Sequence, residues 1–60
     1  MLWLKEIRAK KKYTQEQMSK EIGVAQNTYC NIENGKRRPS VEVAKKIAEV
    51  LDFDWTKFFE

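Results

Sequence analysis

The chain has 60 residues, a formal net charge of +3, one cysteine and no histidine. This length predicts one small domain, and the single thiol predicts a cytoplasmic protein without a disulfide. No apolar run is long enough to cross a bilayer, and charges at Lys5, Glu6 and Arg8 interrupt the only candidate signal segment. The composition therefore excludes disulfide-rich secreted proteins and membrane proteins.

Catalytic and metal-binding patterns are also missing from the sequence. It has no histidine, no glycine loop that could hold a phosphate, and no group of cysteines at metal-ligand spacing. We therefore expect no enzyme activity, no catalytic residue, no metal, no cofactor and no small-molecule ligand.

The charges are unevenly distributed along the chain. Residues 1–40 carry nine Lys or Arg against four Asp or Glu, whereas residues 41–60 carry three against five. A basic front and a mildly acidic back fit a domain that presents one side to a polyanion. An ordinary solvated surface explains the same distribution, so charge alone does not decide between the two interpretations.

Helical periodicity recurs along the chain, and no segment shows the sustained alternation of a strand. Five short helices are predicted, at Leu2 to Lys11, Gln15 to Ile22, about Gln26 to Glu33, Val41 to Leu51 and Trp55 to Phe59. The positions expected to face the core are Leu4, Ile7, Met18, Ile22, Ala44, Ile47, Ala48 and Leu51. The second and third helices are separated by little more than residues 23–25, which is the spacing of a helix-turn-helix.

Capping residues set the predicted boundaries of these helices. Thr14 and Gln17 match a capping box, in which each side chain bonds the backbone of the other residue. Gly23 suits the left-handed turn that ends the second helix. Ser40 and Asp54 are expected to be the N-caps of the last two helices.

The third predicted helix has an uncharged polar face. On a helical wheel, Ala25, Thr28, Tyr29 and Ile32 form one side, and the other consists of Gln26, Asn27, Cys30, Asn31 and Asn34. Asn and Gln side chains can form two hydrogen bonds with an adenine edge in the major groove. The alternative is that these amides face water or cap turns, but the residues that follow favour nucleic acid.

Three cations, Lys36, Arg37 and Arg38, come directly after the turn that ends this helix. Cations at the end of such a helix can bind phosphates and fix its register without reading sequence. The backbone amides beside Gln15, at the start of the second helix, also suit a phosphate. The lysines at 10–12 are expected to contribute long-range attraction at most.

These residues resemble the phage-repressor and Cro-type helix-turn-helix proteins, the XRE family of transcriptional regulators. The resemblance runs from Leu4 to about Phe59 and rests on TQEQMSKEIGV, NTYCNIENGKRRPS and AKKIAEVLDFDWTKFF. It implies an all-α, compact five-helix repressor-like domain over residues 1–60, with the helix-turn-helix in its second and third helices.

The resemblance also implies roles for individual residues. The base-contacting residues would be Gln26, Asn27, Cys30 and Asn31. The phosphate-contacting residues would be Gln15, Asn34, Lys36, Arg37 and Arg38. Arg8 and Glu33 stand where family members often carry a buried structural ion pair. We consider Cys30 a small filler near a thymine methyl rather than a redox switch.

The sequence departs from the family pattern at three positions. Ala25 replaces the usual Ser or Thr N-cap of the recognition helix. Tyr29 stands where an aliphatic residue is commoner, so its hydroxyl must find a partner or reach the surface. Asp52 stands where glycine commonly ends the fourth helix, in a conformation that suits aspartate less well.

The C-terminal segment contains four aromatic residues within positions 53–59. We expect Trp55, Phe58 and Phe59 to form a homodimer interface; the alternative is that Phe53, Trp55 and Phe58 complete the core with Trp3 and Leu4. A two-fold dimer would place two recognition helices about 34 Å apart, one turn of a palindromic operator.

The sequence thus predicts a regulator, most simply a repressor, that binds double-stranded DNA specifically. Two alternatives stay open: a protein-interaction module, antitoxin-like or polymerase-contacting, and a non-specific architectural DNA binder.

Overall fold

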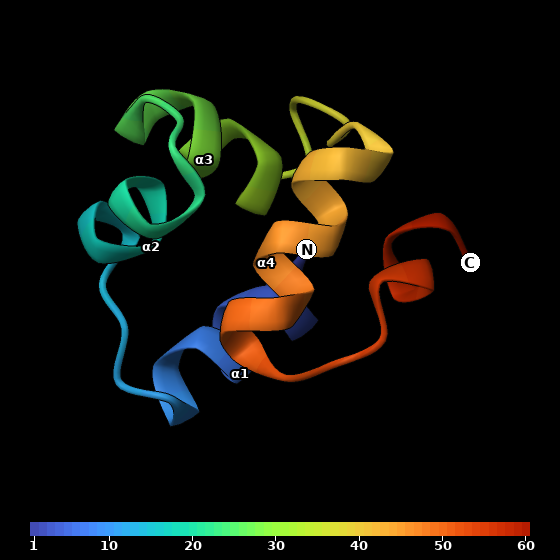
Figure 1. Cartoon of the computed structure of the whole chain (residues 1–60), viewed down its shortest axis with the longest axis horizontal. Helices are drawn as coiled ribbons and strands as arrows, with labels where there is room; N and C mark the ends of the chain where they lie inside the picture. Colours follow the sequence, from blue (N-terminus) through green and yellow to red (C-terminus); the bar gives the residue numbers. More distant parts are fainter.

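The computed structural model describes residues 1–60 and contains helices only (Figure 1). They are α1 (Leu2–Lys10), α2 (Gln15–Ile22), α3 (Gln26–Glu33), α4 (Val41–Leu51) and the 3₁₀ helix η1 (Trp55–Phe59). The predicted all-α class is confirmed. None of the helices combines the length and the apolar character that a membrane crossing requires.

Two details of the predicted helices were wrong. The chain has four α-helices rather than five, because the last segment is a 3₁₀ helix of five residues that begins with a bond from the Lys57 amide to the Asp54 carbonyl (3.1 Å). The first helix ends at Lys10, since Lys11 is its C-cap and Lys12 adopts a left-handed backbone with φ of 63°. The last carbonyls of a helix have no amide partner within it, so the helix ends where turns or other groups can bond them instead.

The predicted caps are present. Thr14 Oγ1 accepts from the Gln17 amide at 3.0 Å, and Gln17 Oε1 accepts from the Thr14 amide at 2.9 Å. Gly23, with φ of 76°, ends α2 in the left-handed conformation that glycine adopts without a steric penalty. Ser40 caps α4 by accepting from the Val43 amide at 3.1 Å. Local hydrogen bonds therefore define where the motif helices start and stop.

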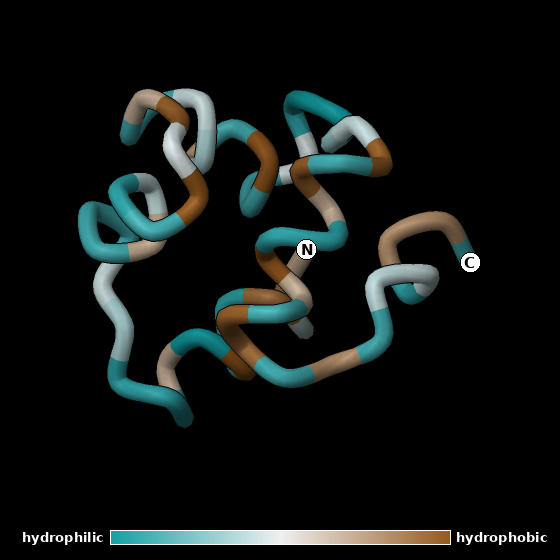
Figure 2. Tube along the Cα trace, viewed as in Figure 1, coloured by the Kyte–Doolittle hydropathy of each residue, from teal (hydrophilic) through white to brown (hydrophobic).

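The helices pack around one hydrophobic core. α2 packs against α3 and α4, α1 contacts α3, and η1 packs on α4. Figure 1 shows α4 running through the middle of the molecule, with α2 and α3 on one side and η1 on the other. The buried core residues come from every helix: Leu4, Met18, Ile22, Tyr29, Ile32, Ala44, Ile47, Leu51 and Phe58. Along the trace in Figure 2, hydrophobic stretches, in brown, alternate with hydrophilic ones, in teal.

Aromatic contacts join the C-terminal segment to α1. The ring of Trp3 lies 5.4 Å from that of Phe53 and 5.1 Å from that of Phe58, measured between centroids, in edge-to-face geometry. Phe53 and Phe58 are themselves 5.6 Å apart. Edge-to-face packing of this kind stabilises beyond simple burial. These contacts hold the C-terminal segment against α1.

Candidate nucleic-acid interface

The two faces of α3 differ in their exposure. Tyr29 and Ile32 are buried, as the helical wheel predicts. On the opposite side, Gln26 and Asn27 are exposed and Asn31 is half-buried. No charged side chain lies among these amides. The helix therefore presents neutral hydrogen-bond donors and acceptors on its free side while its apolar side anchors it to the core.

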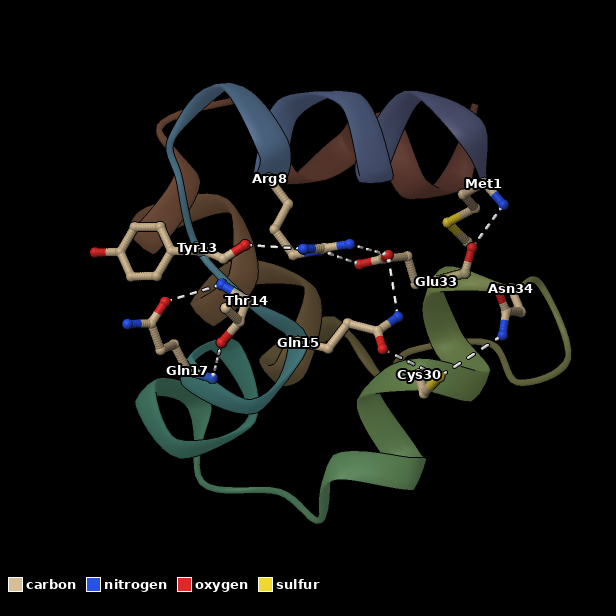
Figure 3. A network of polar contacts seen from close by, with 9 residues as sticks. All are labelled: Met1, Arg8, Tyr13, Thr14, Gln15, Gln17, Cys30, Glu33 and Asn34. Atoms are coloured by element: carbon tan, nitrogen blue, oxygen red, sulfur yellow. Dashed lines mark hydrogen bonds and ion pairs between the residues drawn. The ribbon is translucent and has the colours of Figure 1, made fainter.

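Gln15 joins the start of α2 to α3. Its Nε2 donates to Glu33 Oε1 at 3.3 Å, and its Oε1 accepts from Cys30 Sγ at 3.5 Å (Figure 3). Asn34 Nδ2 in turn donates to Cys30 Sγ at 3.7 Å. Gln15, Cys30 and Asn34 were predicted as separate contacts to DNA, and this chain of bonds between them was not predicted. The i, i+4 spacing of Cys30 and Asn34 was a local signal for one link, but nothing local linked either residue to Gln15.

Arg8 and Glu33 form a bidentate ion pair between α1 and the end of α3 (Figure 3). Arg8 Nε and Nη2 donate to the two carboxylate oxygens, each at 2.9 Å, and Nη1 donates to the Tyr13 carbonyl at 2.8 Å. The Met1 amino nitrogen donates to the Glu33 carbonyl at 2.7 Å. The side chain of Glu33 is fully buried and that of Arg8 is 18% exposed. The ion pair and the Met1 bond therefore both fix the end of α3 relative to α1.

The ion pair shifts the pKa values of its partners in the direction that favours charge. Burial alone raises the pKa of Glu33, but the guanidinium of Arg8, with smaller contributions from the neighbouring Tyr29 hydroxyl and from Gln15, lowers it by more, so the pKa lies below the ordinary value of 4.5. The hydrogen bond to Glu33 raises the pKa of Arg8. Glu33 is thus a carboxylate at neutral pH despite its burial.

The loop after α3 presents three cations to solvent. Its backbone folds back on the helix end, since the amides of Lys36 and Arg37 donate to the Asn31 carbonyl at 2.8 and 3.2 Å. Pro39 is buried and anchors the loop, whereas the side chains of Lys36, Arg37 and Arg38 are exposed and form no ion pair. The Arg38 guanidinium carbon lies 5.1 Å from the centre of the Phe59 ring. Three cations without an acidic partner therefore lie directly after the C-terminal end of α3.

A groove of about 300 Å³ runs between α3, this loop and the start of α4. Val24, Thr28 and Ile32 line one side, and Arg37 and Arg38 line the other. Thr28, which the helical wheel assigned to the apolar side, is half-buried and faces this groove. The cations of the loop thus lie along the flank of the recognition helix.

The three departures from the family pattern have structural consequences. Ala25 is the N-cap of α3 and makes no side-chain capping bond. The Tyr29 hydroxyl is buried and has no hydrogen-bond partner, and burial raises the pKa of Tyr29. Asp52 ends α4 with a left-handed backbone, φ 60° and ψ 60°. Ala25 and Tyr29 thus leave a possible hydrogen bond unmade, and Asp52 adopts a backbone conformation that glycine adopts more easily.

The three residues expected at the dimer interface differ in solvent exposure. Phe58 belongs to the core of its own chain and is only 9% exposed, so its assignment to a dimer interface is corrected. It was misplaced because a run of aromatic residues does not show which ring faces inward. Trp55 and Phe59 are half-buried and pack edge to face with centroids 6.0 Å apart. The surface available to a second copy is therefore smaller than predicted.

Two short helices joined by a left-handed glycine, with an uncharged amide face on the second and three unpaired cations in the loop after it, define a helix-turn-helix DNA-binding domain. A helix-turn-helix family profile matches residues 4–58, and the chain belongs to this family, the XRE-type DNA-binding transcriptional regulators. Proteins of this family are typically not enzymes.

Several relatives have similar sequences. The chain is 53% identical over 58 residues to the uncharacterized HTH-type transcriptional regulator YqaF of Bacillus subtilis, covering 97% of this chain and 76% of YqaF. It is 45% identical over 49 residues to an uncharacterized HTH-type transcriptional regulator of Archaeoglobus fulgidus, covering 82% and 69%. The HTH-type transcriptional regulator AnsR of Bacillus subtilis is 37% identical over 49 residues, covering 82% of this chain and 42% of AnsR. No solved structure matches the chain significantly.

Proposed function

We propose that this regulator is a sequence-specific repressor that binds a palindromic operator as a homodimer. The observation that carries the proposal is the uncharged amide face of α3, exposed beside three cations that have no acidic partner. Amides and a thiol on that face can read base edges, whereas the cations can bind phosphates of any sequence. Occupation of an operator that overlaps a promoter excludes polymerase, so repression is the proposed outcome.

Each residue on the interface has a proposed role. Gln26, Asn27 and Asn31 read bases in the major groove, and Cys30 packs near them. The phosphate contacts come from Gln15, Asn34, Lys36, Arg37 and Arg38. Because the Gln15 side chain already bonds Cys30 and Glu33, its phosphate contact is proposed for the backbone amides at the start of α2.

The homodimer is proposed through Trp55 and Phe59. Both rings are half-buried in the single chain, so each retains apolar surface that a second copy could cover. A two-fold arrangement would place two α3 helices about 34 Å apart, which matches half-sites separated by one turn of DNA.

The first test selects bound duplexes from a random pool at near-physiological salt. A symmetric motif with half-sites one turn apart would support the proposed operator and the dimer. A single short half-site would support specific recognition by a monomer. Failure to enrich any sequence, with the protein folded, would contradict DNA recognition and favour a protein partner instead.

The second test separates base contacts from phosphate contacts. Asn31→Ala and Gln26→Ala are expected to relax the selected motif, each by about 1–3 kcal/mol of discrimination. Lys36→Ala is expected to weaken binding to all duplexes alike and to reduce the slope of log K against log salt by about 0.9. The matched control is Lys57→Ala in η1, which removes the same charge remote from α3. Equal losses on selected and random duplexes for all variants would contradict these roles.

A further inference from the structure

Phe59 lies next to one of the interface cations although it is distant from α3 in sequence. The Arg38 guanidinium carbon is 5.1 Å from the centroid of the Phe59 ring, within the range of a cation–π contact. The Arg38 side chain has no hydrogen bond and no ion pair in the structure. The aromatic ring is therefore the contact that orients this guanidinium.

Phe59 is itself held by the rest of the chain. Its ring lies 6.5 Å from that of Phe58 and 6.0 Å from that of Trp55, measured between centroids. Phe58 belongs to the hydrophobic core. On the other side of the contact, the backbone next to Arg38 is fixed by the buried Pro39. Both partners of the contact thus extend from fixed positions.

The location of Arg38 connects this contact to the recognition helix. Arg38 lines the groove beside α3 together with Val24 and Thr28. A guanidinium that contacts a ring through its flat face keeps N–H groups at its edges for other acceptors. A DNA phosphate at the flank of α3 could accept from those groups while the ring contact persists.

We propose that Phe59 is a positioning residue for DNA binding, which holds Arg38 in place for a backbone phosphate. This inference rests on the proposed DNA contact of the loop. An unrestrained arginine loses rotamer freedom when it binds a phosphate, and Phe59 removes part of that cost before DNA arrives. The C-terminal 3₁₀ helix thereby contributes to DNA affinity without touching DNA.

The test is a double-variant cycle with Phe59→Leu and Arg38→Gln, measured as affinity for a selected duplex over a range of salt concentrations. Phe59→Leu is expected to weaken binding about two- to fivefold, the size of an exposed cation–π contact. Arg38→Gln is expected to weaken it further and to lower the salt slope by about 0.9. In the Arg38→Gln background, Phe59→Leu is expected to weaken binding by a clearly smaller factor, because only the proposed contribution of Phe59 to the dimer is then lost.

Two control variants separate this role from folding and charge. Phe59→Tyr retains the ring beside Arg38 and is expected to bind more tightly than Phe59→Leu. Lys57→Gln removes a cation whose ammonium lies over Trp3, at 5.2 Å, rather than beside the loop, and is expected to leave the affinity nearly unchanged. Thermal melts by circular dichroism establish that each variant is folded at the assay temperature.

Two outcomes would overturn the inference. If Phe59→Leu weakens binding equally in both backgrounds, Phe59 acts through folding or self-association and not through Arg38. If Phe59→Leu has no effect in either background, the ring does not position the cation. In both cases binding by the original chain and a loss in Lys36→Ala would leave the proposed function intact, whereas no binding by the original chain would remove both.

Discussion

At the scale of single residues, the pair of Arg8 and Glu33 has the largest expected effect on stability. Glu33 is fully buried and accepts bonds from two guanidinium nitrogens, so removing either partner leaves a charge without compensation. Breaking a buried pair in this way costs about 3–5 kcal/mol. A domain of this size has roughly 3–9 kcal/mol of total stability, so the loss would be severe.

The depressed pKa of Glu33 predicts how stability depends on pH. A carboxyl group with a lowered pKa contributes stability above its unfolded value, here 4.5, and this contribution is lost as the pH falls through the folded value. We expect the free energy of unfolding in urea to decline below about pH 4.5. In Glu33→Gln this decline should be shallower, from a lower starting stability. Glu49→Gln, at an exposed position of α4 without an ion pair, is the control; an unchanged pH profile in Glu33→Gln would contradict the assignment.

The Tyr29 hydroxyl predicts a stabilising substitution. A buried donor without a partner costs about 1–3 kcal/mol, and phenylalanine has the same ring without that group. We expect Tyr29→Phe to raise the free energy of unfolding by about 1 kcal/mol in urea titrations. Tyr13→Phe, at a half-buried position, should change it little. A loss of stability in Tyr29→Phe would show that the hydroxyl bonds the nearby carboxylate of Glu33.

At the scale of the helices, α3 begins without a side-chain cap, as α1 does. α2 has a complete capping box and α4 a serine cap, but the N-cap of α3 is alanine and leaves the first amides without a side-chain acceptor. Free amides at a helix N-terminus can instead bond an anion. The missing cap is therefore compatible with a start of α3 that meets DNA.

The substitution Ala25→Ser tests whether the missing N-cap lowers the stability of the domain. The backbone of Ala25, at φ −65° and ψ 149°, already has the extended conformation of an N-cap. Ala25→Ser is expected to raise the free energy of unfolding by about 1 kcal/mol, with an unchanged urea m-value. Ala9→Ser, inside α1, offers no such gain and is the matched control. No difference between the two variants would show that the first turn of α3 is satisfied in another way.

At the scale of the whole molecule, η1 closes the core and also borders the DNA-binding loop. Phe58 packs inward against Trp3 and Phe53, whereas Trp55 and Phe59 remain partly exposed. One short segment thus carries a core residue, a candidate dimer surface and the ring beside Arg38. Substitutions in η1 should therefore affect either folding or self-association, depending on the residue that is replaced.

Substitutions of two neighbouring aromatic residues test that separation. Phe58→Ala is expected to lower the free energy of unfolding by about 3 kcal/mol, because it leaves a cavity in the core. Trp55→Ala should cost less in stability but weaken self-association. Thermal unfolding and sedimentation velocity measure the two effects. Similar losses of association in both variants, each still folded, would contradict the assignment of Trp55 to the dimer surface.

The helices and most of their boundaries could be predicted from the sequence by itself. Helix periodicity, the capping box at Thr14, the stop at Gly23 and the cap at Ser40 depend on residues within four positions of one another. The chemical character of the amide face of α3 was predictable for the same reason. The position of the Arg8–Glu33 pair came from the family resemblance rather than from any local pattern.

Only the tertiary structure decided how distant residues meet. Gln15 bonds both Cys30 and Glu33, Phe58 turns into the core, and Phe59 lies over Arg38. These contacts join residues 15 to 21 positions apart, or select one aromatic ring from a cluster, and no local pattern encodes them. They depend on how the helices pack around the core, because packing determines which side chains share a space.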